Sequence, residues 1–134
     1  SWTQAAKLLS TDIDYQDYFG YSVSTSGGIL LIGAQYDDDG GLNSGSAYIF
    51  TENTLGTWTQ AAKIVAGDAA ASDYFGSGVS ISSGVLVVGA RLNDDAGTSS
   101  GSAYVFTEST SGSWTQDAKI VATDAGSGDM FGWS

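Results

Sequence analysis

An internal repeat is the feature that most limits what this chain can fold into. Trp2, Trp58 and Trp114 stand 56 residues apart, and the two complete copies align without a gap and agree at more than half of their positions. Gapless copies indicate one supersecondary unit that is repeated and buries its core against its neighbours. The chain of 134 residues therefore holds about 2.4 units of 56 residues.

Each unit is predicted to contain four short β-strands, because short apolar and aromatic runs alternate with Gly- and Ser-rich turns. In the first unit the expected strands are 19–26, 29–32, 45–51 and 57–65, and residues 2–9 have the pattern of the last of these. The continuous apolar run at 29–32 predicts a strand with both faces buried. Four antiparallel strands at this period are typical of β-propeller blades, so the predicted fold class is all-β.

The repeat divides the chain into four parts. Residues 1–10 are predicted to end a preceding unit, residues 11–66 and 67–122 to be the first and second blades, and residues 123–134 to start a third. Two blades do not close a ring on their own, so neighbouring blades of the same or another chain are expected as partners. We favour the interpretation that the chain is a segment of a larger repeat protein.

Composition excludes several classes of function. The formal charge is −11, from 15 acidic residues against four basic ones, and such a surface repels nucleic acids and anionic membranes. No apolar run approaches the roughly 20 residues of a membrane span, so no membrane insertion is expected. The chain has no His and no Cys, which rules out a Ser-His-Asp triad or a thiolate metal site within it. The sequence therefore predicts a protein that is not an enzyme.

Calcium is the one cofactor for which the sequence offers candidate ligands, because Ca²⁺ prefers carboxylate and amide oxygens. The candidates follow the second strand of each unit: Asp37, Asp38 and Asp39, with Asn93, Asp94 and Asp95 as the second copy. Three consecutive Asp side chains cannot all face one ion in an ordinary loop. The alternative is therefore a set of Asx turns that keeps the rim of the blade polar.

Other polar and aromatic positions separate into repeated and variable ones. Asp12 and Asp17 recur in every copy, which favours a turn-forming role, whereas Asp14 is replaced by an alanine in the second copy. Tyr15 and Trp133 also differ between copies, at positions where a binding face would lie. The repeated Trp residues are interpreted as packing residues, with a row for stacking sugars as the alternative.

The chain resembles the FG-GAP repeat family, the blade type of integrin-α-like β-propellers, and is most similar to its microbial surface-protein subgroup. The resemblance rests on Phe19-Gly20-Tyr21-Ser22-Val23, Leu30-Leu31-Ile32-Gly33-Ala34 and Gly45-Ser46-Ala47-Tyr48-Ile49-Phe50. It implies that the Phe-Gly strand is innermost in its blade and the Trp-Thr-Gln strand outermost, so residues 1–10 would be the outer strand of a preceding blade. Integrin-type blades often bind calcium between their first two strands, but residues 24–28 carry no carboxylate, so that site is not implied here.

The resemblance and the repeat together predict an extracellular or cell-surface adhesion or protein-interaction module. Its partner would be a protein or glycan ligand on a cell surface or in a matrix. Two alternatives remain open: a structural subunit of a surface fibre or filament, and a carbohydrate-binding platform.

Overall fold

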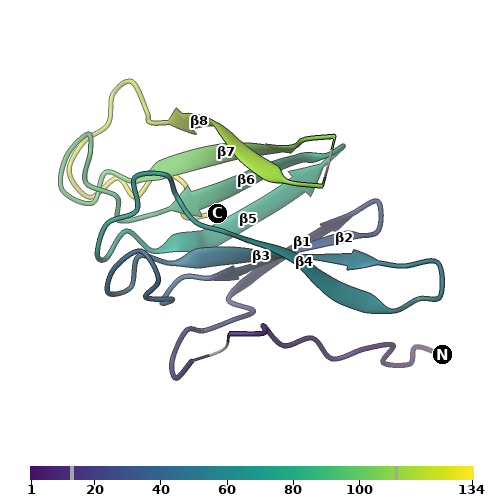
Figure 1. The fold of residues 1–134 in the computed structure, drawn as a ribbon. Coiled ribbons are helices and arrows are strands. Elements are labelled where there is room, and N and C mark those ends of the chain that lie inside the picture. The colour runs from purple at the N-terminus through teal and green to yellow at the C-terminus, as the bar shows by residue number, and fades with distance from the viewer. Residues whose placement is uncertain (13, 111) are drawn as a thin grey trace.

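The computed structural model describes residues 1–12, 14–110 and 112–134, and within them eight strands form two four-stranded antiparallel sheets with no helix (Figure 1). The strands run in meander order, β1-β2-β3-β4 in the first sheet and β5-β6-β7-β8 in the second. Their bounds are β1 Ser22–Ser26, β2 Ile29–Ala34, β3 Ser46–Glu52, β4 Trp58–Ile64, β5 Phe75–Ser82, β6 Val85–Ala90, β7 Ser102–Glu108 and β8 Trp114–Ile120. The all-β prediction of open, four-stranded blades is confirmed.

Tight turns set the register of the inner hairpins. Gly27 and Gly28, between β1 and β2, have φ of +58° and +77°, and Ser26 pairs with Ile29 across the turn. Two successive positive φ angles are what a type I′ turn requires, and glycine adopts them without a steric penalty. This register brings the start of β1 and the end of β2 to the same edge of the sheet.

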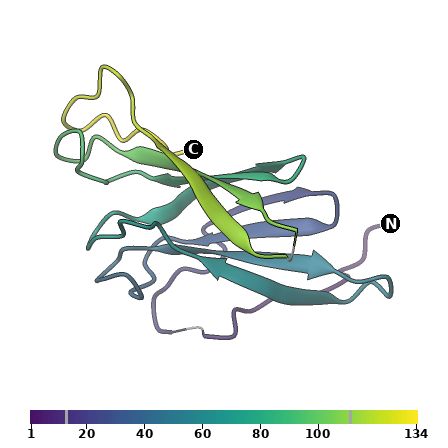
Figure 2. The same ribbon diagram turned by 45° about the horizontal axis from the view of Figure 1, so that its top comes forward.

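The main core lies between the two sheets, which stack as two layers in Figure 2. Leu31 and Ile49 of the first sheet are fully buried against Phe75, Leu86 and Val88 of the second. Side chains alternate across a strand, so the neighbouring positions of the first sheet point to its other face. There they form a smaller cluster of Ile32, Ala34, Tyr48 and Phe50, against which Leu8, Phe19 and Trp58 pack.

Glycines permit the closest approach between the sheets. A Cβ on Gly33 of β2 would overlap the carbonyl oxygen of Gly76 on β5, and the Ser22 Oγ donates a hydrogen bond of 2.8 Å to the same oxygen. The contact recurs one unit later, where a Cβ on Gly89 would overlap the carbonyl oxygen of Gly132. The minimal side chains that end each second strand therefore serve backbone contact between successive units.

The outward face of the second sheet is less covered than its equivalent in the first. Leu31 is 0% exposed between the sheets, whereas the equivalent Val87 is 38% exposed and Val85 is 40% exposed. The prediction that the apolar second strand is buried on both faces is therefore met by β2 more fully than by β6. The reason is that the described residues place a second sheet against only one face of β5–β8.

The strand expected at residues 2–9 is not formed. Its equivalents Trp58–Ile64 and Trp114–Ile120 pair with β3 and β7, whereas among the described residues no strand pairs with residues 2–9. The segment runs extended beneath the first sheet, where Leu8 packs on the smaller cluster and Trp2 is fully exposed (Figure 1). The segment repeats the sequence pattern of β4, but a strand also needs a neighbouring strand with which to pair.

Candidate functional site

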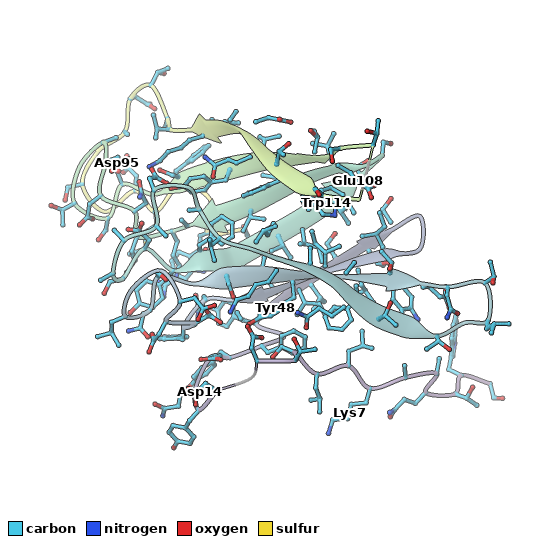
Figure 3. All side chains as sticks on the ribbon, in the orientation of Figure 1. Lys7, Asp14, Tyr48, Asp95, Glu108 and Trp114 are labelled. Carbon is cyan, nitrogen blue, oxygen red and sulfur yellow. The ribbon has the colours of Figure 1, made fainter. Side chains whose placement is uncertain are left out.

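Most of the variable and charged side chains gather at one end of the two sheets, which we call the loop end. It is formed by the loops that precede β1 and β5 and the loops that follow β2 and β6. Figure 3 places Asp14 and Asp95 at this end, while Glu108 and Trp114 lie at the opposite end. The antiparallel register explains the gathering, because the end of each second strand meets the start of each first strand.

A lysine-centred cluster occupies the loop end of the first sheet. The ammonium of Lys63, on β4, donates to the carboxylates of Asp12 at 2.8 Å, Asp37 at 2.8 Å and Asp39 at 2.5 Å. Tyr48 stands opposite Lys63 on β3, and its hydroxyl donates to Asp37 at 3.0 Å. We call Lys63, Asp12, Asp37 and Asp39 the first lysine cluster, and it ties the two loops to the outer strand.

Burial and charge pairing both shift the pKa values in the first lysine cluster. Burial disfavours the charged form of Lys63, but hydrogen bonds to Asp12, Asp37 and Asp39 outweigh it and raise the pKa of the ammonium. Burial opposes ionisation of Asp12 as well, yet the hydrogen bond from Lys63 keeps the pKa of this carboxyl below its ordinary value. Burial of the phenol raises the pKa of Tyr48 to about 12. Lys63 and Asp12 are therefore held in their charged forms at neutral pH.

The second sheet repeats the cluster with fewer carboxylates. The Lys119 ammonium pairs with Asp68 at 2.6 Å and with Asp95, and the Tyr104 hydroxyl donates to Asp68 at 3.0 Å. Asn93 stands where the first copy has Asp37. Its side-chain amide donates to the Asp73 carboxylate and accepts from the Ser102 hydroxyl, rather than pairing with the lysine. Lys119, Asp68 and Asp95 form the second lysine cluster, so the lysine–carboxylate arrangement belongs to the blade architecture.

Two further carboxylates carry raised pKa values. Burial raises the pKa of Asp17, and the charges of Asp37 and Asp14 add to the effect. Burial likewise raises the pKa of Asp73, which accepts a hydrogen bond from the Asn93 amide at 3.2 Å. Both residues precede the first strand of their unit, where Asp17 accepts from the backbone N–H of Asp14 and Asp73 from that of Ala70, as expected of turn-forming residues.

The calcium candidates lie at the loop end, but their side chains bond to other groups of the same chain. Asp37 and Asp39 face the Lys63 ammonium, and the Asp38 Oδ1 accepts the backbone N–H of Asn43 at 2.6 Å. Asp94 closes the second loop in the same way through the N–H of Ser99, at 2.6 Å. In the residues that the structure describes, no three acidic side chains are arranged to hold a metal ion. This geometry matches the Asx-turn alternative; calcium binding stays a prediction, to be tested by calorimetric titration to millimolar calcium.

An aromatic row crosses the loop end from the first blade to the third copy. The Tyr18 and Tyr36 ring centroids lie 4.7 Å apart, and Tyr36 meets Tyr74 edge to face at 5.1 Å. The Arg91 guanidinium then lies 4.6 Å from the centre of the Tyr74 ring and 5.5 Å from that of Trp133. Sequence reasoning missed this row, although variation between copies at Trp133 was a partial signal for it.

A hollow of about 300 Å³ opens beside the start of this row. We call it the tyrosine hollow, and it is lined by Tyr15, Gln16, Tyr18, Tyr36, Asp38, Leu42 and Asn43. Tyr15 is 85% exposed and Tyr18 is 56% exposed, so large aromatic surfaces face solvent here. Such surfaces, rimmed by polar groups, are the usual chemistry of a binding face.

The sequence profile of the FG-GAP repeat matches residues 2–50, 58–106 and 114–134. The chain belongs to the FG-GAP repeat family. FG-GAP repeats build β-propeller blades, they are generally not enzymes, and they are typical of extracellular and surface proteins. A search among curated proteins found no match to the chain. In the described part of this FG-GAP chain, no helix has the length and apolar character to cross a membrane.

Proposed function

We propose that this pair of FG-GAP blades is a non-enzymatic module that binds a protein on a cell surface or in an extracellular matrix. The observation that supports the proposal is the aromatic row at the loop end. It spans side chains of both blades and the third copy, on loops that the shared core between the sheets holds in place. Binding residues commonly lie on loops that a rigid scaffold positions.

The loop end also has the composition of an interaction surface. Tyr and Trp are enriched at protein interfaces because they bury a large area with few rotatable bonds, and Arg is enriched for its planar hydrogen bonding. Trp133 is 53% exposed, and Leu42 beside the tyrosine hollow is 66% exposed. These side chains leave apolar area in water that a partner would cover.

A solid-phase assay tests the proposal directly. The chain is immobilised, and purified matrix proteins and a glycan array are applied in parallel. Saturable binding to one or more proteins is the expected result. Binding confined to glycans would replace the proposal with the carbohydrate-binding alternative, and the absence of saturable binding to either would refute it.

Assembly through the open face of the second blade is a second candidate function. Val85 and Val87 are exposed on a face whose equivalent in the first sheet is covered by another blade. Blades of another chain that covered this face would build the fibre alternative. Light scattering across a range of concentrations tests this, since open stacking gives a mass that grows with concentration, whereas a mass that stays constant contradicts it.

A further inference from the structure

The tyrosine hollow shares a wall with a hollow lined by carboxylates. Tyr15 and Asp38 line both, and the second, of about 180 Å³, is otherwise lined by Asp12, Asp14, Asp17, Asp37 and Asp39. An aromatic surface thus adjoins a strongly acidic one within the loops of a single blade. The face of an aromatic ring and a carboxylate both attract cations, so the two hollows favour the same kind of ligand.

The negative charge beside the tyrosine hollow is not balanced by the protein. Lys63 pairs with Asp12, Asp37 and Asp39, and no ion pair involves Asp14 or Asp38 in the ranges that the structure covers. The raised pKa of Asp17, which follows from burial and from nearby carboxylates, is consistent with this excess of negative charge. A cation that entered the tyrosine hollow would therefore meet a carboxylate that no cation already occupies.

The second blade shows that the architecture does not need these side chains. Asp14 becomes Ala70, Tyr15 becomes Ala71 and Tyr36 becomes Leu92 in the second copy. The left-handed backbone conformation is kept at this position, since Tyr18 has a φ of +57° and its equivalent Tyr74 a φ of +58°. The first blade therefore adds a carboxylate and two phenol rings to a loop scaffold that folds without them.

The second blade also shows which cation this end of the fold accepts. The guanidinium of Arg91 lies over the ring of Tyr74 and also near the ring of Trp133. Its Nε donates to the Gln35 side chain at 3.3 Å. Tyr18 is the equivalent of Tyr74, but among the described residues the ring of Tyr36 lies against it and no cation does. The first blade thus presents the aromatic surface of this arrangement without the guanidinium.

We propose that the tyrosine hollow binds an arginine side chain of the partner protein. The guanidinium would lie against the tyrosine rings and pair with the Asp38 carboxylate, which the planar guanidinium suits better than a lysine ammonium. This inference rests on the proposed function, because it names the chemistry through which the partner is recognised.

The test is a titration with an acetylated and amidated hexapeptide of alternating Gly and Arg, followed by calorimetry and by amide NMR shifts. We expect saturable binding that weakens as NaCl is raised from about 50 to about 500 mM, since salt screens exposed charges. The amide shifts are expected to centre on the loops that contain Tyr15 and Tyr36. An equivalent hexapeptide of Gly and Glu is expected not to bind.

Matched variants locate the binding. Tyr15→Ala combined with Tyr36→Leu introduces the second copy's own residues and should weaken peptide binding about tenfold, and Asp38→Asn should weaken it about fivefold. Asp94→Asn removes the same charge from the equivalent position of the second blade and should change affinity less than about twofold. Equal weakening by Asp38→Asn and Asp94→Asn would show diffuse attraction to an acidic surface and would overturn the inference.

The outcome also separates this inference from the proposed function. If the peptide fails to bind while the chain still binds a matrix protein, the arginine site is wrong and the interaction module stands. If a glycan rather than the peptide shifts the amides of the tyrosine hollow, the arginine site is also wrong. If neither the peptide nor any matrix protein binds, both proposals fail. An unchanged thermal midpoint for each variant shows that its loss of binding does not reflect unfolding.

Discussion

Replacing Lys63 with methionine should destabilise the chain far more than the same replacement at Lys119. The Lys63→Met variant leaves the Asp37 carboxylate, whose side chain is only 4% exposed, without its cation. Removing one partner of a buried ion pair costs about 3–5 kcal/mol, because the remaining charge stays desolvated. Asp37 keeps the hydrogen bond from the Tyr48 hydroxyl, so we expect about 3 kcal/mol, the lower end of this range.

Lys119→Met is the matched control within the same chain. The partners of Lys119 are Asp68 and Asp95, whose side chains are 42% and 60% exposed, and exposed ion pairs contribute about 0–1 kcal/mol each. The expected loss is therefore about 1 kcal/mol. Both variants change the net charge equally and remove an ammonium from the same strand position, so the difference of about 2 kcal/mol measures the burial of Asp37.

Urea unfolding followed by tryptophan fluorescence measures both losses, provided that the slopes of the transitions agree. Adding Asp37→Asn to Lys63→Met makes the first blade resemble the second, which carries Asn93, and should recover about 2 kcal/mol. Equal losses for the two lysine variants, or no recovery in the double variant, would refute the reasoning that one buried carboxylate dominates the first lysine cluster.

Three further predictions follow from the packing and the ionisable groups. Gly33→Ala should cost about 1–3 kcal/mol in urea unfolding, because its Cβ would overlap backbone of the neighbouring sheet. Gly67→Ala, whose Cβ would approach only the flexible end of a side chain at 3.4 Å, is the control and should cost less than about 1 kcal/mol; equal costs would contradict the close-packing argument. Tyr48 should ionise near pH 12 in a titration of ultraviolet absorbance, above the ordinary tyrosine value of about 10, and an absorbance change that is complete near pH 10 would contradict its burial. Thermal midpoints should rise as pH falls from 7 toward 4, since the raised pKa of Asp17 makes the folded state take up its proton first. The midpoints should fall again below about pH 4, because Asp12, with its lowered pKa, stabilises the fold only while it is ionised. A midpoint that falls steadily from pH 7 would contradict the raised pKa of Asp17.

The period of the repeat and the strand pattern were readable from the sequence because they depend on neighbours along the chain. Alternating aromatics at Tyr48 and Phe50, the glycine pair at Gly27 and the apolar run from Ile29 each report a local backbone preference that the structure confirms. Stacking of one sheet on the next followed from the repeat itself, since a blade has two apolar faces to cover.

Partners of the charged side chains could not be read in the same way. In the sequence Asp12 is interpreted as turn-forming and Asp37 and Asp39 as calcium candidates, and nothing links any of them to Lys63. Asp12 lies 51 residues from Lys63 in the sequence, so only the meander and the path of the loops bring them together. The sequence offers the Asp triplet as a candidate calcium site with Asx turns as the alternative, and only the structure shows that two of its three carboxylates meet an ammonium.

The sequence by itself determined the blade, because hydrophobic periodicity and turn chemistry act over a few residues and are repeated in every copy. Only the tertiary structure decided which side chains meet at the loop end and which apolar face stays exposed. Tyr36 of the first unit reaches Tyr74 of the second, and Arg91 reaches Trp133 of the third, through the stacking of the sheets. Contacts of this kind depend on how rigid units pack on one another, and that packing combines residues that no local pattern connects.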